Sequence, residues 1–311
     1  MSEFHHISVL LEECLDGLNI RPDGIYVDGT LGGAGHSSQI VRRLDTGRLI
    51  GIDRDPVALK AAGERLKEYA DKVTLVHSNF CRIGEVLQEL GIPAVDGILL
   101  DLGVSSPQLD DGARGFSYMA DAPLDMRMNS EDTLTAHTVV NTWSYEELRR
   151  ILFDFGEERY APQIAAAICR CRERKPIDTT FELVDVIRSA MPASALREKQ
   201  HPAKRSFQAI RIAVNDELGA VREVMDAAIP KLKPGGRLAV ITFHSLEDRI
   251  VKNAMNEAAR GCTCPPEFPV CVCGKKPQVK LITKKPMVSG DEELERNPRA
   301  RSAKLRICEK L

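Results

Sequence analysis

A glycine-rich stretch directly after a short apolar run constrains the fold of this chain more than any other part of its sequence. Residues 25–27 read Ile-Tyr-Val, and residues 28–36 continue as Asp-Gly-Thr-Leu-Gly-Gly-Ala-Gly-His. A β-branched, apolar run of this kind is typical of a buried strand, and the glycines allow a sharp turn that brings backbone N–H groups close to a ligand. The stretch predicts a ligand loop after a first strand, although a tight turn without a ligand has the same local pattern.

The spacing of the glycines separates two classes of cofactor. The dinucleotide fingerprint G-x-G-x-x-G needs a glycine or alanine three places after Gly35, where this chain has Ser38, and the acid Asp28 opens the loop instead. A second acid, Asp53, follows about two dozen residues later, where a βαβ unit places a carboxylate to bind the ribose hydroxyls. The same segment suits a helix start, so we expect Asp55 to cap that helix. The pattern favours S-adenosylmethionine over NAD.

Strand-like and helix-like patterns alternate through the first hundred residues. The expected helices are 37–44 and 56–70, and the next expected strands are 49–53, 73–77 and 95–101. This alternation predicts a parallel, doubly wound sheet, which binds ligands beyond the carboxyl ends of its strands. Asp101 ends the fourth strand. Phe80 follows the third, where either an adenine contact or a place in the core would explain it.

Composition limits the class of protein. The 311 residues are 43% hydrophobic and 28% charged, which is typical of a globular protein, and the formal net charge of −2 gives no global basicity. Nucleic-acid binding would therefore depend on local basic patches. No apolar run approaches the roughly 18 residues of a membrane span, and the first residues do not resemble a signal peptide. We expect a cytoplasmic protein without membrane contact.

Residues 111–214 interrupt the alternation. Helical spacing recurs at 143–155, 161–174, 181–191 and from Lys204, and no segment between them reads as a strand. The pattern predicts an all-helical domain, 111–214, inserted into a discontinuous α/β domain of residues 1–110 and 215–311. Two basic runs could contact phosphates there, although any single charge is as well explained by solvent exposure. The runs are Arg170, Arg172, Arg174 and Lys175, and Arg197, Lys199, Lys204, Arg205 and Arg211.

The last third of the chain returns to strands. Residues 237–243 are expected to form a fifth strand after a Pro-Gly-Gly turn at 234–236, and residues 278–283 and 303–308 alternate as a final pair. His244 follows the fifth strand, where it could orient a substrate or cap the next helix.

Six motifs spread along the chain carry a family resemblance. They are Asp28 to His36, Gly51 to Pro56 (GIDRDP), Asp101 to Asp110 (DLGVSSPQLD), Phe207 to Leu218 (FQAIRIAVNDEL), Phe243 to Arg249 (FHSLEDR) and Asn297 to Ser302 (NPRARS). Together they resemble the RsmH (MraW) family from end to end. The resemblance implies a class I S-adenosylmethionine-dependent methyltransferase with a Rossmann-like seven-stranded sheet. Its expected reaction is methylation of the exocyclic N4 of a cytosine in small-subunit (16S) ribosomal RNA.

The resemblance also implies site residues and a partner. Contacts to S-adenosylmethionine would fall on Gly33, Ala34, Gly35, His36, Asp53, Phe80, Asp101 and Gln108. Asp101 is the catalytic candidate because class I methyltransferases hold the methyl-accepting atom at the end of this strand. The expected partner is 16S rRNA in the small ribosomal subunit, and a homodimer is left open. A cofactor-binding RNA chaperone or assembly factor without catalysis is the alternative function.

The chemistry requires hydrogen-bond acceptors, because the lone pair of a cytosine amine is delocalised into its ring. Amine methyltransferases commonly carry Asp/Asn-Pro-Pro-aromatic after strand four, whereas this chain has Asp101-Leu-Gly-Val. We expect the backbone carbonyl of Leu102 or Gly103 to serve as the second hydrogen-bond acceptor. Phe116, Tyr118 or Phe243 would stack on the target base in place of the missing aromatic residue. A mechanism at cytosine C5 would need a nearby nucleophilic cysteine. None lies between Cys81 and Cys169, so nitrogen is the expected methyl acceptor.

Four cysteines lie close together near the carboxyl terminus. Cys262 and Cys264 form one C-x-C pair, and Cys271 and Cys273 form another. Zinc knuckles usually have C-x₂₋₄-C spacing. We therefore expect a loop of reduced cysteines without a metal, and tetrahedral zinc is the alternative.

Overall fold

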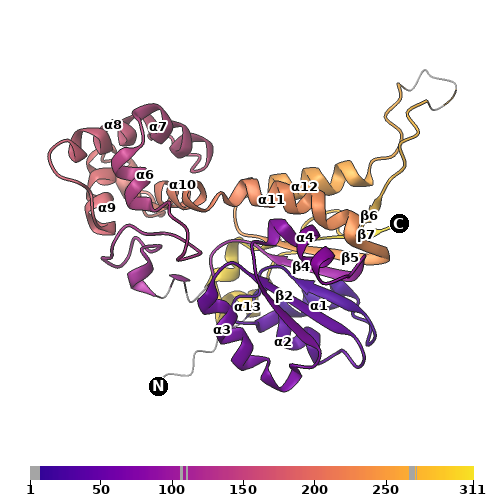
Figure 1. Cartoon of the computed structure of the whole chain (residues 1–311). Helices are drawn as coiled ribbons and strands as arrows, with labels where there is room; N and C mark the ends of the chain where they lie inside the picture. Colours follow the sequence, from indigo (N-terminus) through magenta and orange to yellow (C-terminus); the bar gives the residue numbers. More distant parts are fainter. Residues whose placement is uncertain (1–7, 106–107, 110, 266–269, 271) are drawn as a thin grey trace. The chain divides into compact units, whose positions relative to one another are not determined.

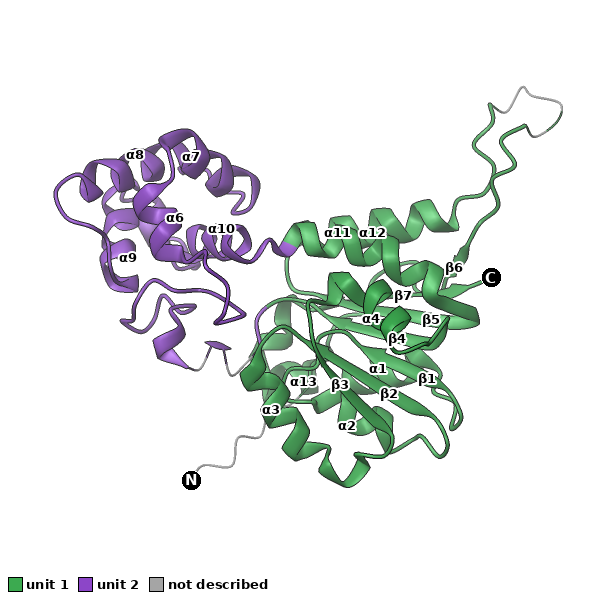
Figure 2. Cartoon of the chain, viewed as in Figure 1, with its two compact units in different colours: residues 1–103, 218–311 green, residues 104–217 purple. Residues whose placement is uncertain are grey.

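A computed structural model describes residues 8–105, 108–109, 111–265, 270 and 272–311. The chain divides into two compact units, residues 1–103 with 218–311 and residues 104–217 (Figure 2). The second unit begins at Val104 instead of residue 111, because Val104 and Leu109 pack against its core. It ends at Glu217 instead of residue 214.

The first unit is built on a seven-stranded sheet with the order β3-β2-β1-β4-β5-β7-β6 (Figure 1). Its strands are β1 Ile25–Asp28, β2 Arg48–Asp53, β3 Val73–His77, β4 Val95–Asp101, β5 Leu232–Thr242, β6 Val279–Leu281 and β7 Lys304–Lys310. Strands β1 to β5 pair in parallel, whereas β7 is antiparallel to both β5 and β6. This sheet, with the helical insertion between β4 and β5, confirms the predicted class I methyltransferase fold.

Helices cover both faces of the sheet because the central strands are apolar on both sides. One face packs on α4 Ile83–Glu89, α11 Glu217–Ala228 and α12 Ser245–Ala259. The other packs on α1 Leu11–Leu18, α2 Gly35–Val41 and α3 Pro56–Arg65. Helix α13, Asp291–Arg296, lies near the carboxyl end of the chain. No helix within the described residues has both the length and the apolar character needed to cross a membrane.

Two expectations about segment boundaries were wrong. The Pro-Gly-Gly segment at 234–236 lies inside β5, where the pairing with β4 jumps from Val95 opposite Leu232 to Gly97 opposite Arg237. This bulge accommodates residues that would otherwise break a strand. Helix α3 ends at Arg65, and a 3₁₀ turn takes up 67–69, so the helix is shorter than the expected 56–70.

The second unit is helical. Its helices are α6 Ala136–Thr142, α7 Tyr145–Asp154, α8 Ala161–Arg172, α9 Thr180–Ser189 and α10 Lys204–Asn215, with α6 the helix that the sequence pattern missed. Capping boxes begin α7 at Ser144 and α9 at Thr179. The helices enclose a core of their own, and Asn215 joins it to the preceding loop by accepting from the Met128 N–H and donating to the Met126 carbonyl. The unit therefore has the interior of an independent domain.

Candidate cofactor site

Asp28 shapes the glycine-rich loop from within. Its carboxylate is buried, accepting hydrogen bonds from the Ser37 hydroxyl (2.7 Å) and the Thr30 N–H (3.1 Å). Burial raises its pKa. Since both oxygens have partners inside the loop, Asp28 fixes the path of the backbone.

The backbone of the loop leaves two amides available to a ligand. Gly32 and Ala34 adopt left-handed conformations with φ of 50° and 58°, and such strain in a residue other than glycine gathers at functional sites. Within the described residues, the N–H groups of Gly33 and Gly35 have no acceptor. A Cβ built on Gly33 would meet nothing within 4 Å. The loop thus offers two donors beside open space, which suits an anionic group.

Asp53 joins the loop to the end of β2. One carboxylate oxygen accepts from the Gly32 N–H at 2.7 Å, and the other from the Asp55 N–H at 2.8 Å. Burial, reinforced by the charges of Asp55 and Asp28, raises the pKa of Asp53 to about 6. Because each carboxylate oxygen can accept two hydrogen bonds, Asp53 keeps the capacity to bind two ribose hydroxyls. The cap expected at Asp55 is confirmed, since its side chain accepts from the Val57 N–H at 3.0 Å.

Phe80 borders the same loop. It opens the 3₁₀ turn Phe80–Arg82 and is half-buried against the core cluster on the α4 side of the sheet. A Cβ built on Gly29 would lie 3.3 Å from the Phe80 Cβ, so the Phe80 side chain begins next to the loop. The contact with the core agrees with one of the two sequence interpretations, and the adenine contact stays a prediction.

Asp101 ends β4 next to the loop. Its N–H donates to the Thr30 hydroxyl at 2.6 Å, and its side chain is 23% exposed. Oδ1 is buried and has no hydrogen-bond partner among the described residues. Burial, with the charges of Asp28 and Glu247, raises the pKa of Asp101 to about 8. A buried carboxylate oxygen without a partner at a ligand-binding edge is a candidate functional group.

The His36 side chain lies beside that of Asp101. Its ring is buried, with Nε2 3.0 Å from the Val9 carbonyl oxygen and Nδ1 3.8 Å from Oδ2 of Asp101. The side chain thus joins the amino-terminal segment to the end of β4. The cofactor contact that the family resemblance implies for His36 stays a prediction.

Gln108 belongs to the second unit. It is buried there, accepting from the Ser105 N–H at 3.1 Å and donating to the Met128 carbonyl at 3.5 Å. The other seven candidate residues all lie in the first unit, so Gln108 is described apart from them. No local pattern would have singled it out.

The candidates for holding the target base divide between the units. Phe243 lies beside Gly103, where a built Cβ would be 3.5 Å from its ring. Phe116 is buried in the core of the second unit, and Tyr118 stacks on His201 with 4.5 Å between ring centroids. Within the first unit, Phe243 therefore lies next to the residue pair that follows β4.

His244 caps α12. Its Nδ1 accepts from the Glu247 N–H at 3.4 Å, and Oε2 of Glu247 accepts in return from the N–H groups of His244 and Phe243. Of the two roles considered for His244, the cap is confirmed. The sequence reading missed Glu247, and Thr30 as well, although a hydroxyl inside a glycine loop is a recognisable signal.

The residues of the two basic runs differ in what they contact, and the half-buried Arg205 donates to the Glu157 carbonyl at 3.0 Å. Arg172 donates to the carbonyls of Val140 and Trp143, and Arg211 forms a two-point ion pair with Glu217. These two hold the unit together. Six others are exposed to solvent, namely Arg170, Arg174, Lys175, Arg197, Lys199 and Lys204.

Comparison with known proteins decides the family. A model described as the MraW methylase family matches residues 3–311. The chain belongs to the MraW methylase family. It is 60% identical over 310 residues to the ribosomal RNA small subunit methyltransferase H of Heliobacterium modesticaldum, covering 99% of each protein. Identity to the protein of the same name from Brevibacillus brevis is 58% over 309 residues, covering 99% of this chain and 98% of that one.

Solved structures are more distant. A structure titled as a putative rRNA-methylase from Clostridium thermocellum has 10% identity and a TM-score of 0.45, covering 98% of this chain and all of that one.

The residues of the first unit fit S-adenosylmethionine. Two loop amides suit its carboxylate, the remaining acceptor capacity of Asp53 suits its ribose, and the Asp101 oxygen suits a cationic centre or an amine. Phe80 adds an apolar face. All five groups lie at the carboxyl edge of β1 to β4, where doubly wound sheets bind ligands.

Proposed function

We infer that this protein transfers a methyl group from S-adenosylmethionine to the exocyclic N4 of a cytosine in small-subunit (16S) ribosomal RNA. One observation carries the inference. In a chain of the MraW methylase family, Asp101 places a buried oxygen without a partner at the end of β4, beside the loop and Asp53. That position suits an acceptor for the amine.

Each residue has a separate task in the proposed site. Asp53 accepts the ribose hydroxyls, and the Gly33 and Gly35 amides bind the carboxylate of the methionyl group. Phe80 contacts the adenine. Bound S-adenosylmethionine supplies a methyl group on a cationic sulfur.

Asp101 prepares the amine. Its Oδ1 accepts an N–H of the exocyclic amino group, which draws the nitrogen lone pair out of conjugation and directs it toward the methyl group. After transfer, the same oxygen can accept the proton that the nitrogen must lose. The carbonyl of Gly103 is proposed as second acceptor, and Phe243 as the stacking ring. Gln108 is assigned to the cofactor on the family resemblance.

The helical unit is proposed to hold the ribosomal RNA. The six exposed side chains of the two basic runs can contact phosphates, which position a nucleic acid without reading its sequence. Arg172 and Arg211 are excluded from this role because their guanidinium groups serve internal contacts. We further propose that the protein works in the cytoplasm, where small subunits are assembled.

Methyl transfer to defined substrates tests the function. The purified full chain would be incubated with radiolabelled S-adenosylmethionine and either naked 16S rRNA or assembled small subunits lacking the modification. We expect N4-methylcytidine in the digested RNA, identified by mass spectrometry against C5-methylcytidine and N3-methylcytidine standards. A single-turnover measurement shows which substrate is used.

The alternative of a non-catalytic assembly factor gives a different result. In that case calorimetry detects binding of the cofactor, and the chain also binds RNA. Neither substrate receives a methyl group, even at enzyme excess. C5-methylcytidine as product would overturn the choice of nitrogen. Sedimentation of the same preparation decides between monomer and homodimer.

A further inference from the structure

Three cysteine thiols converge in the loop between α12 and β6. The Sγ atoms of Cys262, Cys264 and Cys273 all lie within 4.8 Å of one another, and those of Cys262 and Cys273 are 3.7 Å apart. Residues eleven positions apart in the chain thus bring their sulfurs together in an exposed loop. Cys271 lies outside the described residues.

Backbone amides point at each of these sulfurs. The Thr263 N–H donates to Cys273 at 3.4 Å, the Cys264 N–H to Cys262 at 3.4 Å, and the Val272 N–H to Cys264 at 3.3 Å. A metal binds cysteine through its sulfur as the thiolate. The loop backbone is therefore arranged around three acceptor sulfurs.

The spacing of the sulfurs fits a tetrahedral metal. Two thiolates, each about 2.3 Å from a zinc ion, are about 3.8 Å apart at the tetrahedral angle. The 3.7 Å between Cys262 and Cys273 agrees with this value. A disulfide would require about 2.05 Å. The geometry is that of neighbouring ligands and not of a covalent pair.

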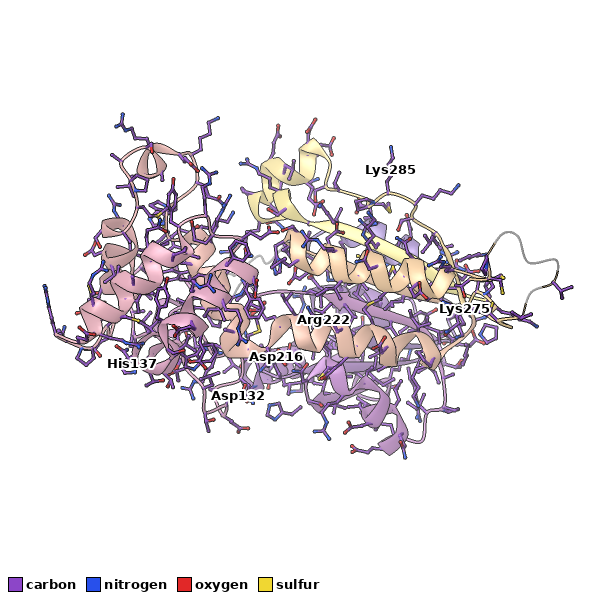
Figure 3. All side chains as sticks on the ribbon, turned by 90° about the horizontal axis from the view of Figure 1, so that it is seen from above. Asp132, His137, Asp216, Arg222, Lys275 and Lys285 are labelled. Atoms are coloured by element: carbon purple, nitrogen blue, oxygen red, sulfur yellow. The ribbon has the colours of Figure 1, made fainter. Side chains whose placement is uncertain are left out.

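The described side chains of this loop bury little apolar surface. Val270 and Val272 are 70% and 73% exposed, so they contribute almost no apolar burial. Its base is fixed, since the Gln278 N–H donates to the Ala258 carbonyl at 2.8 Å and Lys275, labelled in Figure 3, pairs with Glu257. A bound metal would close the remaining span from residue 262 to 273, as it does in small domains without a core.

We propose that Cys262, Cys264 and Cys273 bind a structural zinc ion. Binding releases the three thiol protons to solvent and leaves three thiolates on the metal, with the fourth position of the tetrahedron taken by another donor. Zinc is the metal of choice because it accepts thiolates in tetrahedral geometry and has no redox chemistry. The site is separate from the residues assigned to methyl transfer. It also departs from our expectation of reduced cysteines without a metal.

Metal analysis of the untagged full chain tests the proposal. The protein would be purified under reducing conditions with added Zn²⁺ and then dialysed. Bound zinc would be measured by elemental mass spectrometry. We expect one zinc ion per chain, and an X-ray absorption spectrum with at least three sulfur neighbours at about 2.3 Å. Substitution by Co²⁺ should give the intense near-ultraviolet thiolate-to-cobalt absorption.

Matched variants identify the ligands. Cys262→Ser and Cys273→Ser should each reduce bound zinc at least tenfold, whereas Cys171→Ser, a partly buried cysteine of α8, should keep one ion per chain. Limited proteolysis of the loop should speed up in the ligand variants and on adding chelator to the parent chain. Absence of zinc from the reduced parent chain, a disulfide among these cysteines, or retained zinc in both ligand variants would overturn the proposal.

Discussion

Nδ1 of His36 lies 3.8 Å from Oδ2 of Asp101, while Nε2 of the same ring lies 3.0 Å from the carbonyl oxygen of Val9. A carbonyl can only accept, so the hydrogen bond to Val9 places a proton on Nε2 of His36. The other oxygen of the carboxyl, Oδ1, is buried and has no partner among the described residues, so it is available to a group from outside the protein.

Asp53→Ala should weaken S-adenosylmethionine binding by about 2–4 kcal/mol, because it removes a charged acceptor of two ribose hydroxyls. That loss corresponds to a rise in Kd of roughly 30- to 1,000-fold. Calorimetry measures it, and circular dichroism checks that the variant is folded. Asp55→Ala is the control, since it removes a helix cap at the same turn and should change stability more than affinity. A folded Asp53→Ala chain with parental affinity would remove Asp53 from the site.

Asp101→Asn should lower methyl transfer about 100- to 1,000-fold, since the amide cannot take the amine proton. In the parent chain, kcat/KM should rise with pH and level off near pH 8, where Asp101 becomes ionised. The variant should lack this rise. Initial rates between pH 6 and 9.5 test both statements, and an unchanged profile in the variant would assign the titration to another group.

Asp101 should also make the cofactor-free protein less stable as pH rises. Its pKa is about 8 in the folded chain and about 3.9 when unfolded, so between these values the folded state holds the extra proton and stability falls with increasing pH. Asp101→Asn should therefore stabilise the chain at pH 8.5 by on the order of 1–3 kcal/mol, with no such gain at pH 4. Urea unfolding at the two pH values measures the difference.

A second buried acid provides the contrast. Asp96 accepts from the Ile25 N–H at 2.8 Å, pairs with Lys233 at 2.7 Å and also pairs with Arg21. Asp96→Asn should destabilise the chain at pH 8.5 by about 1–3 kcal/mol, because it loses charge-assisted hydrogen bonds. Stabilisation by both substitutions would mean that a general charge effect, and not the position of Asp101, is being measured.

Neutralising Arg170 and Arg174 together should weaken RNA binding about tenfold and lower the slope of log affinity against log salt by about 1–2. Both side chains are exposed, so the fold should be unaffected. Arg149→Ser with Arg150→Ser on α7 is the matched control, since both are exposed arginines of the same unit outside the two basic runs. Filter binding at several salt concentrations compares them. Equal losses in the two double variants would show a diffuse charge effect.

The alternating pattern predicted the parallel sheet and the order of its elements because buried strands need apolar runs and each is bounded by a loop. The resemblance, and not spacing, supplied Gln108. The bulge at 234–236 was missed because Pro-Gly-Gly is a turn signal by itself, and only pairing with β4 shows that the chain continues as strand. Likewise, no local pattern shows that Arg172 and Arg211 are engaged internally, because their acceptors lie on other segments. The close approach of the Cys262, Cys264 and Cys273 thiols depends on the path of the loop backbone. The C-x-C spacing alone does not predict that path.

The insertion between β4 and β5 has a consequence for synthesis on the ribosome. Residues 95–100 of β4 are buried in the finished sheet, and their β5 neighbour begins about 130 residues after β4 ends. At about 5–20 residues per second, the edge of β4 stays without its partner for on the order of ten seconds. During that interval the helical segment can complete its own core, whereas the open edge is exposed to pairing with other nascent chains. Slowed translation between codons 104 and 231 should therefore increase aggregation more than an equal delay placed after residue 242.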